Sequence, residues 1–437
     1  MKFPFLVRII GGICLTSAFI NCAFSLYAQE QVTQPKPKPK LTPEQRAAAK
    51  QRDEERKNEL ALKRRETFAV LPENDDSPLA KEYQSSLLKF RESMSNLDQV
   101  RTRQQFETDF SKSKRDEILV KWTTAIAEGN NALATWLSKA GEIYASDPDK
   151  YQQIGEALSE MMLADTKLDK FDPWLAPAKA LIGSNRFNNE ANLLAAGMVG
   201  LANADFDFVE QCWTTLQQEG KLPGIELSFF GQLASLKEKW KREQEIRQKE
   251  AEKADNPRVE LMTSKGKIIV ELYEDSAPEA VASFIYLVEK GYYNFSTFFR
   301  VEQHVCAQAG CEKGDGTGSP GYIFAGEANH PEHRDHFRGS LTLALGSDKN
   351  TGQIGKDSGG SQFFFSFLPM PYLDGTYTVF GRIVEGQPCI NLFRVMNLAN
   401  EDERKNTSNR PDSIMSAKVV RKRSHEYRPN ILAGKLR

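Results

Sequence analysis

The sequence predicts a multidomain α and β protein, in which an all-α N-terminal domain precedes a domain built of many short β-strands. A chain of 437 residues is too long for a single hydrophobic core. Residues 43–254 contain few glycines and repeat apolar side chains at helical spacing, whereas residues 257–424 alternate apolar and polar side chains between Gly, Asp and Pro clusters. The composition changes abruptly at Asp255-Asn256-Pro257, which we take as the boundary between the domains.

The first 28 residues have the pattern of a secretory signal peptide. Lys2 and Arg8 precede an uncharged run from Ile9 to Ala28, which ends on a small residue. The run is also long enough to span a bilayer, so an uncleaved N-terminal anchor is the main alternative, and a buried helix is a further one. A signal peptide or an anchor predicts an exported protein of the periplasm or cell envelope, attached to the membrane only if the segment is uncleaved. A Pro- and Lys-rich tether is expected at residues 29–42.

Residues 43–254 are expected to form a series of antiparallel helix pairs. The helical spacing is clearest in residues 133–143, 154–162 and 193–201. Residues 189–220 resemble a tetratricopeptide-type hairpin, but no regular period repeats, so the domain is either TPR-like or a plain helical array. A TPR-like domain would offer a concave surface to a protein partner, whereas a plain array would act as a spacer. The tryptophans of this domain are interpreted as packing residues: Trp136, Trp174, Trp213 and Trp240.

Two segments, residues 44–65 and 237–253, consist almost entirely of charged side chains. Neither sustains an apolar heptad repeat, which favours solvated helices over coiled coils. The second segment ends at the predicted domain boundary.

Beyond residue 257 the pattern becomes that of short β-strands. Residues 258–262 and 267–273 alternate around Ser264-Lys265-Gly266, which indicates a β-hairpin. Residues 278–290 should form a helix with one apolar face. Further strands are expected at residues 341–345, 362–367 and 378–384. Many short strands with one helix are typical of a closed barrel or a sandwich. The basic residues 425–437 are expected to form a solvated tail.

Charge and motif spacing argue against several classes of function. The chain has 58 Lys plus Arg against 59 Asp plus Glu, a net charge of −1, so no nucleic acid partner is expected. His330, His333 and His336 are evenly spaced, but their neighbours suggest an exposed turn and no fourth ligand is near, so neither a metal nor another cofactor is expected. The Gly-rich residues 314–321 lack the following Lys-Ser/Thr of a phosphate-binding loop and suggest a surface loop instead.

The C-terminal region carries an ordered series of motifs. In chain order they are KGKIIVELYEDSAPEAVASFIYL, STFFRV, a Gln308-x-Gly310 element, GDGTGSPGY, RGSLTLAL, GGSQFFFSF and YLDGTYTVFGRIVEG. One such motif would be modest evidence, but the whole set, spread over residues 257–424, resembles the cyclophilin family of peptidyl-prolyl cis-trans isomerases. The resemblance implies a closed antiparallel β-barrel with capping helices and an enzyme whose substrates are proline-containing polypeptides.

The chemistry of such an enzyme is rotation about an amide bond, which resonance opposes with a barrier of about 18–20 kcal/mol. No nucleophile is needed, because a hydrogen bond donated to the prolyl nitrogen weakens the resonance. A charged donor fork beside apolar walls is therefore the expected arrangement. By resemblance, Arg300 is the catalytic arginine, Gln308 binds the substrate backbone and Phe364 is a wall for the proline ring.

The resemblance also implies a set of substrate-binding positions: Val305, Cys306, Ala344, Gln362, Tyr372, Leu373 and Tyr377. Val305 and Cys306 stand where the family commonly has a Phe-Met pair, so the pocket loses an aromatic wall. Tyr372 and Tyr377 replace a Trp and a His, which are milder changes because tyrosine keeps an aromatic body and a polar tip. A disulfide between Cys306 and Cys311 would constrict the pocket in an oxidising compartment, which is a further hypothesis.

The sequence thus predicts an isomerase that assists the folding of exported and envelope proteins. The alternative is a non-catalytic Pro-peptide-binding or chaperone module, with the helical domain as a partner-binding scaffold. Arg300 and the Val305–Cys306 pair are the features that discriminate between the two.

Overall fold

The computed structural model describes residues 71–72, 75–105, 111–346, 354–400, 404 and 410–436. The predicted signal peptide, the tether and the first charged segment all precede residue 71 and lie outside the described residues. Among the helices that are described, none combines the length and the apolar character needed to cross a membrane.

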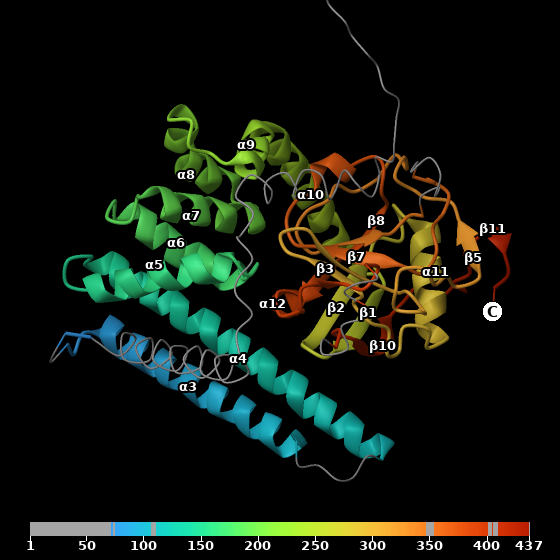
Figure 1. Cartoon of the computed structure of the whole chain (residues 1–437), viewed down its shortest axis with the longest axis horizontal. Helices are drawn as coiled ribbons and strands as arrows, with labels where there is room; N and C mark the ends of the chain where they lie inside the picture. The colour runs from blue at the N-terminus through green and yellow to red at the C-terminus, as the bar shows by residue number, and fades with distance from the viewer. Residues whose placement is uncertain are drawn as a thin grey trace, which may run out of the picture.

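Helices make up the N-terminal half of the described chain (Figure 1). The two longest, α3 (Pro78–Gln105) and α4 (Lys112–Ser146), pack side by side in opposite directions. The shorter helices stack beside them: α5 (Gln152–Thr166), η1 (Asp172–Trp174), α6 (Leu175–Gly183), α7 (Glu190–Ala202), α8 (Phe206–Gln218), α9 (Gly224–Gly231) and α10 (Leu233–Lys253). Pairing of consecutive helices is therefore observed, while the TPR-like character stays a prediction.

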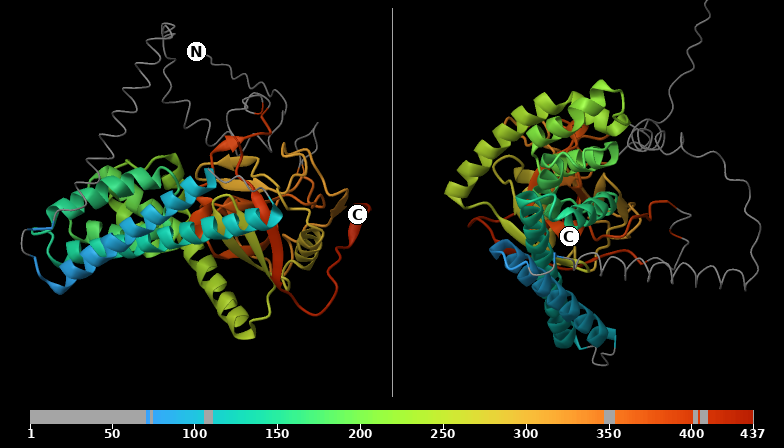
Figure 2. Two further views of the ribbon diagram at one scale, coloured as in Figure 1. Left: turned by 90° about the horizontal axis from the view of Figure 1, so that it is seen from below. Right: turned by 90° about the vertical axis from the view of Figure 1, so that its left-hand side faces the viewer.

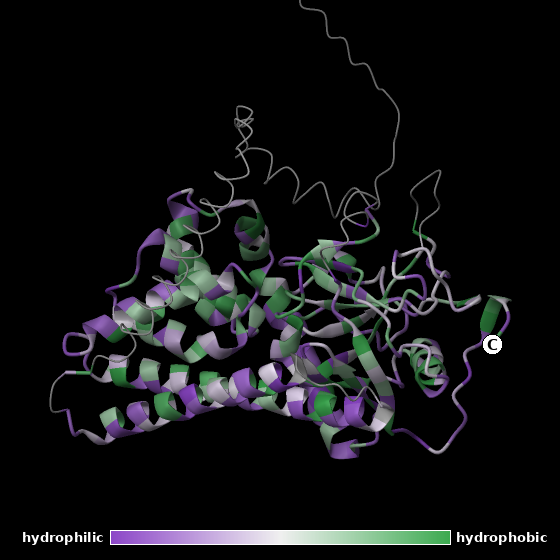
Figure 3. Cartoon of the chain, turned by 60° about the horizontal axis from the view of Figure 1, so that its bottom comes forward, coloured by the Kyte–Doolittle hydropathy of each residue, from purple (hydrophilic) through white to green (hydrophobic). Residues whose placement is uncertain are grey.

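The core of this helical domain lies between the stacked helices. Trp136, Trp174 and Trp213 are almost fully buried in it, and Trp240 packs against it, so the predicted packing role is confirmed. Figure 3 shows hydrophobic ribbon segments within the stack and the sheet, whereas hydrophilic and hydrophobic segments alternate along α3 and α4.

The helices α7 and α8 show how local sequence fixes this packing. Asn189 and Asp205 begin the two helices by accepting hydrogen bonds from backbone N–H groups of the first turns, at 3.0 Å and 3.1 Å. Gly197 then lets the helices approach closely, because a Cβ there would lie 1.9 Å from Trp213 Nε1. The same indole N–H donates to the Leu193 carbonyl at 3.2 Å.

The C-terminal domain is a nine-stranded antiparallel sheet in the order β10-β1-β2-β8-β6-β7-β4-β3-β9. The strands are β1 (Arg258–Thr263), β2 (Gly266–Leu272), β3 (Arg300–Glu302), β4 (Cys306–Ala309), β6 (Ser340–Leu343), β7 (Phe363–Ser366), β8 (Val379–Glu385), β9 (Met396–Asn397) and β10 (Ile414–Arg421). The sheet is curled, because an isolated bridge joins Thr297, before β3, to Ser413, before β10. A closed barrel stays a prediction.

The apolar face of α11 (Pro278–Glu289) covers the core of this sheet, with Val281, Phe284, Ile285 and Val288 buried. Phe284 meets the ring of Phe363 from β7 edge-on. The predicted helix at residues 278–290 is confirmed.

The C-terminal tail contains a strand that its basic residues did not predict, although most of its side chains are exposed as expected. β11 (Ile431–Gly434) pairs with β5 (Tyr322–Phe324) in a second, two-stranded sheet. Tyr427 is buried, and its hydroxyl donates to Glu274 at 2.5 Å. The side chains of β11 are exposed, so the strand is held through its backbone rather than through an apolar pattern.

The two domains share a large interface (Figures 1 and 2). Phe337 and Leu368 of the C-terminal domain belong to the apolar core of the helical domain, and Trp240 packs edge-on against Phe337 with ring centroids 4.8 Å apart. The α4 helix runs on past the helical stack to contact β1 and β2, and Trp122 on it donates to the Ser264 carbonyl at 3.0 Å.

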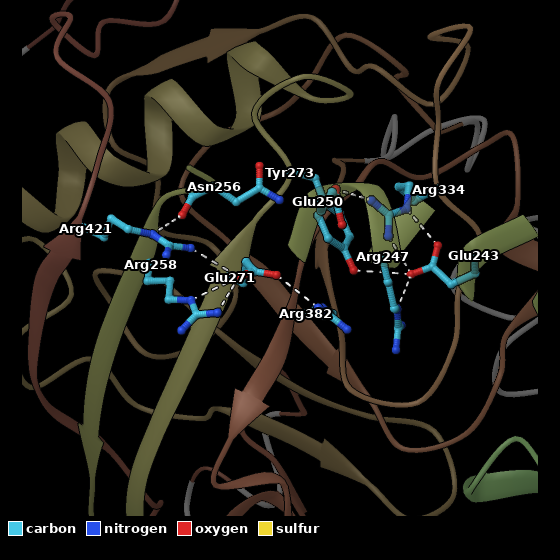
Figure 4. Close-up of polar contacts among 10 residues, drawn as sticks. All are labelled: Glu243, Arg247, Glu250, Asn256, Arg258, Glu271, Tyr273, Arg334, Arg382 and Arg421. Atoms are coloured by element: carbon cyan, nitrogen blue, oxygen red, sulfur yellow. Dashed lines mark hydrogen bonds and ion pairs between the residues drawn. The ribbon is translucent and has the colours of Figure 1, made fainter. Parts of the chain in front are cut away.

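A buried ion network closes the interface (Figure 4). Arg334 donates to Glu243 at 2.6 and 2.7 Å and to Glu250 at 2.7 Å, and its guanidinium lies 3.7 Å from the centroid of the Tyr273 ring. Glu243 is 4% exposed. The expectation of a fully solvated helix at residues 237–253 is therefore wrong for the face of α10 that meets Arg334.

Candidate active site

Three strands carry the predicted catalytic residues in a single row. Arg300 on β3 pairs with Gln308 on β4, and Gln308 pairs with Phe364 on β7. Directly opposed residues of neighbouring antiparallel strands point to the same face of a sheet. The fold therefore brings Arg300, Gln308 and Phe364 together although they lie far apart in the sequence.

One edge of the Arg300 guanidinium is hydrogen-bonded to Glu302, and Arg300 also lines the cavity described below. Its Nε and Nη2 groups donate to the Glu302 carboxylate at 2.9 and 2.8 Å. Its Nη1 group donates to Gln308 Oε1 at 3.3 Å and lies 4.0 Å from the Cys306 sulfur. Burial alone would lower the pKa of Arg300, but interaction with Cys306 and Glu302 outweighs it and raises the pKa, so the donor stays charged.

An apolar cluster lies beside this donor. Its buried members are Val305, Cys306, Phe364, Met370 and Leu373, and Ala344 and Tyr377 pack against them. The Tyr377 ring meets Phe364 edge-on at a centroid separation of 6.2 Å. The cluster forms one wall of a cavity of about 720 Å³, which Arg300 and Gln308 also line.

A glycine-rich loop forms the opposite rim. Gln362 Nε2 donates to the carbonyls of Gly316 and Gly318 at 2.9 and 3.0 Å, and its Oε1 accepts from Gln308 at 3.1 Å. Residues 316–320 line the cavity. The loop predicted at residues 314–321 is therefore part of the pocket rim, with backbone carbonyls directed at a glutamine.

Nine of the ten predicted site residues line the cavity: Arg300, Val305, Cys306, Gln308, Ala344, Gln362, Phe364, Leu373 and Tyr377. Tyr372 does not line it and is 56% exposed. Tyr372 and Leu373 are neighbours on the short helix η2 (Pro371–Leu373), which turns their side chains in different directions.

Two residues that shape the apolar wall and the position of Arg300 were not among the predicted ones. Met370 adds a buried thioether wall, and Glu302 holds Arg300, the predicted catalytic arginine. The period-two spacing from Arg300 to Glu302 is a signal that could have indicated the second, because it places both side chains on one face of a strand.

The cysteines of the site are free thiols. Cys306 and Cys311 are both buried and neither forms a disulfide. Cys311 instead accepts hydrogen bonds from the backbone N–H groups of Gly316 and Gly318 at 3.2 and 3.1 Å, which shapes the glycine-rich loop. The hypothesis of a bridge that constricts the pocket is therefore not supported by the structure.

The three evenly spaced histidines do not form a common centre. His336 is buried, and its Nδ1 lies 2.7 Å from Asp374, whereas His333 contacts the backbone carbonyl of His330. An exposed turn was expected here. That expectation is wrong for Arg334 and His336, because both side chains are buried. Among the described residues, no group of three or more Cys, His, Asp or Glu could hold a metal ion.

The comparisons with known proteins concern this same domain. Residues 258–419 match the family model described as cyclophilin type peptidyl-prolyl cis-trans isomerase/CLD. A peptidyl-prolyl cis-trans isomerase of Helicobacter pylori is 41% identical over 139 residues, which are 32% of this chain and 80% of that protein. Peptidyl-prolyl cis-trans isomerase B of Bacillus subtilis is 39% identical over 142 residues, 32% of this chain and 90% of that protein.

The chain belongs to the cyclophilin family. Among solved structures, a cyclophilin type peptidyl-prolyl cis-trans isomerase of Cryptosporidium parvum is similar, with 25% identity, a TM-score of 0.32, and coverage of 38% of this chain and 97% of that one. The family match begins at residue 258, so the cyclophilin domain is the β-rich half, and the helical domain precedes it.

Proposed function

We propose that this cyclophilin isomerises X-Pro bonds of exported and envelope proteins, and that Arg300 acts by donating a hydrogen bond to the prolyl nitrogen. The observation that supports the proposal is the position of Arg300 Nη1, at the edge of the apolar cluster and 3.3 Å from Gln308. A proline ring held on Phe364, Met370 and Leu373 would place its nitrogen near a permanently charged donor.

The physical reason is that the nitrogen lone pair is delocalised in the planar amide and becomes localised as the bond twists. A donor that meets the lone pair only in the twisted state lowers the barrier of about 18–20 kcal/mol without tightening the ground state. Gln308 and Gln362 would hold the peptide backbone on either side of the twisting bond. Because the Glu302 carboxylate occupies the Nε–Nη2 edge of the guanidinium, the direction of the Nη1 donor is fixed before substrate binds.

The test is a protease-coupled assay on a proline peptide with the full chain. Arg300→Ala is expected to lower kcat/KM by about a hundredfold, the loss typical of removing one preorganised donor. Arg300→Lys should lose nearly as much, because an ammonium group cannot pair with Glu302 and still present a fixed donor. The matched control is Arg101→Ala, which removes an arginine from the exposed surface of α3. A wild-type rate equal to that of Arg300→Ala would overturn the enzymatic proposal.

A partner-binding role of the helical domain is the second candidate. The observation in its favour is that Leu88 and Met94 on α3 and Val120 on α4 are 57%, 44% and 55% exposed. Large apolar side chains on an otherwise hydrophilic helix pair are suited to holding unfolded segments. If Arg300→Ala still suppresses the aggregation of an unfolded client, holding is independent of isomerisation; a wild-type chain without this effect would contradict the role.

Export is proposed from the N-terminal residues alone. Fractionation of cells that make the full chain, with a variant lacking residues 2–28 as the control, is expected to place the wild type in the envelope fraction and the variant in the cytoplasm. A cytoplasmic wild-type protein would contradict the proposal.

A further inference from the structure

The turn between β3 and β4 contains an uncommon backbone conformation. Val305 N–H donates to the Glu302 carbonyl at 3.1 Å and closes a tight turn. His304, inside this turn, has φ of 60°. This left-handed region favours glycine or asparagine, and a histidine adopts it only where its surroundings compensate.

The compensation comes from the helical domain. The backbone N–H of His304 lies 3.1 and 3.0 Å from the two carboxylate oxygens of Asp169, and its imidazole Nδ1 lies 2.5 Å from one of them. The Asp169 side chain is 4% exposed. Asp169 lies in the turn that follows α5. This turn is anchored by the fully buried Phe171, whose ring centroid lies 6.4 Å from that of the His304 imidazole.

This contact is close to the catalytic groups. The residue that opens the turn is Glu302, the carboxylate that holds Arg300, and the residues that follow it are Val305 and Cys306 of the apolar cluster. β3 is three residues long and β4 four. In so short a hairpin, the turn conformation decides how the strands twist and where Glu302 and Cys306 point.

We propose that Asp169 of the helical domain is a positioning residue for the isomerase: it fixes the His304 turn, and through it the orientation of Glu302 and Arg300. The inference rests on the proposed function, because it concerns the same arginine. It assigns the helical domain a role in setting the geometry of the active site, independent of any partner that the domain binds.

The test uses the full chain and the proline-peptide assay. Asp169→Ala is expected to lower kcat/KM by about tenfold, because small displacements of a reacting group have effects of this order. Asp169→Asn, which keeps an oxygen for the His304 N–H, should lose less. Since glycine adopts positive φ without strain, Asp169→Ala is expected to have little further effect in a His304→Gly background. Equal losses in both backgrounds would overturn the proposal.

The matched control is Asp172→Ala. Asp172 lies three residues from Asp169 in the same interface and accepts from Arg338 at 2.6 and 2.9 Å, but it does not touch the hairpin. The Asp172→Ala variant should have a lower melting temperature, while its kcat/KM changes less than about twofold. A similar loss of activity in both variants would show general loosening of the interface instead. An inactive wild-type chain would overturn the proposed function as well, whereas an active wild type matched by Asp169→Ala would overturn only this inference.

Discussion

Cys306 shows at the scale of one residue how burial decides reactivity. The side chain is 3% exposed in the apolar wall of the pocket, and burial raises its pKa from 9.0 to about 11. Only the thiolate is nucleophilic. A protonated and buried thiol can therefore serve as a wall of the pocket without becoming a redox group.

We accordingly predict slow alkylation of Cys306. A pKa about two units above the ordinary value leaves about a hundredfold less thiolate at pH 7. Peptide mass mapping of the full chain during iodoacetamide treatment should show modification of Cys306 at least that much slower than of a cysteine introduced as Arg101→Cys on the exposed face of α3. Equal rates at the two positions would contradict the described burial.

The sequence could predict most residues that line the pocket, but not the residues that support Arg300 or complete the apolar wall. Motif order located Arg300, Gln308 and Phe364, because the family resemblance carries these positions directly. It did not predict Glu302 or Met370, whose roles depend on which face of a strand or loop meets the cavity. Tyr372 does not line the cavity, because adjacent residues of a short helix diverge by a third of a turn, and its role in substrate binding stays a prediction.

At the scale of elements, the packing of α7 against α8 depends on the absence of one Cβ. Gly197 is buried against Trp213, itself fully buried. Alanine is the better helix former by about 1 kcal/mol. A contact at 1.9 Å cannot be tolerated without moving the indole, and overpacking typically costs about 1–3 kcal/mol, so the clash should outweigh the propensity.

Gly197→Ala is therefore expected to destabilise the protein by up to about 2 kcal/mol in denaturant unfolding, the difference between these two terms. Gly129→Ala on α4 is the matched control, because a Cβ there meets nothing within 4 Å. It should stabilise by up to about 1 kcal/mol. Changes of the same sign in the two variants would be incompatible with the packing described.

Sequence periodicity was sufficient to predict α5, α11 and the β1–β2 hairpin, and also α7, although α7 is buried on nearly all sides. It could not predict β11, whose side chains are all exposed and whose pairing with β5 consists of backbone contacts. It also did not predict that α4 is one helix of 35 residues shared by both domains. Its continuation beyond the helical stack is fixed by contacts with β1 and β2, which no local pattern records.

At the scale of the whole molecule, charged residues join the domains. Glu243 is buried between Arg334 and Arg247. Burial alone would raise the pKa of Glu243, but the two guanidinium groups outweigh it and lower the pKa from 4.5 to about 2. In the sequence, Glu243 and Glu250 resembled residues of a solvated helix face, because their shared partner Arg334 lies on a loop far along the chain.

The lowered pKa of Glu243 makes the stability of the protein depend on pH. A carboxyl with a lowered pKa contributes stability above the unfolded value of 4.5, and this contribution is lost as the pH falls toward about 2. Thermal unfolding is expected as one transition at pH 7, with the domain junction weakening between pH 4.5 and 2. Glu243→Gln should destabilise the protein by up to about 3–5 kcal/mol at pH 7, because it leaves the buried Arg334 with Glu250 as its one remaining carboxylate partner among the described residues.

The control for this prediction is Glu117→Gln, which removes an exposed carboxylate that pairs with two lysines on α4. It should leave the free energy of unfolding almost unchanged, because solvent screens an exposed ion pair. Equal destabilisation in the two variants would contradict a special role of the buried network.

The insertion of Phe337 and Leu368 into the helical core has a practical consequence for protein production. Excision of residues 257–437 would leave both side chains in water beside the unpaired guanidinium groups of Arg334 and Arg338. Such a fragment should be poorly soluble and should self-associate through this new apolar patch. Expression of the cyclophilin domain by itself would then require Phe337 and Leu368 to be replaced by polar residues.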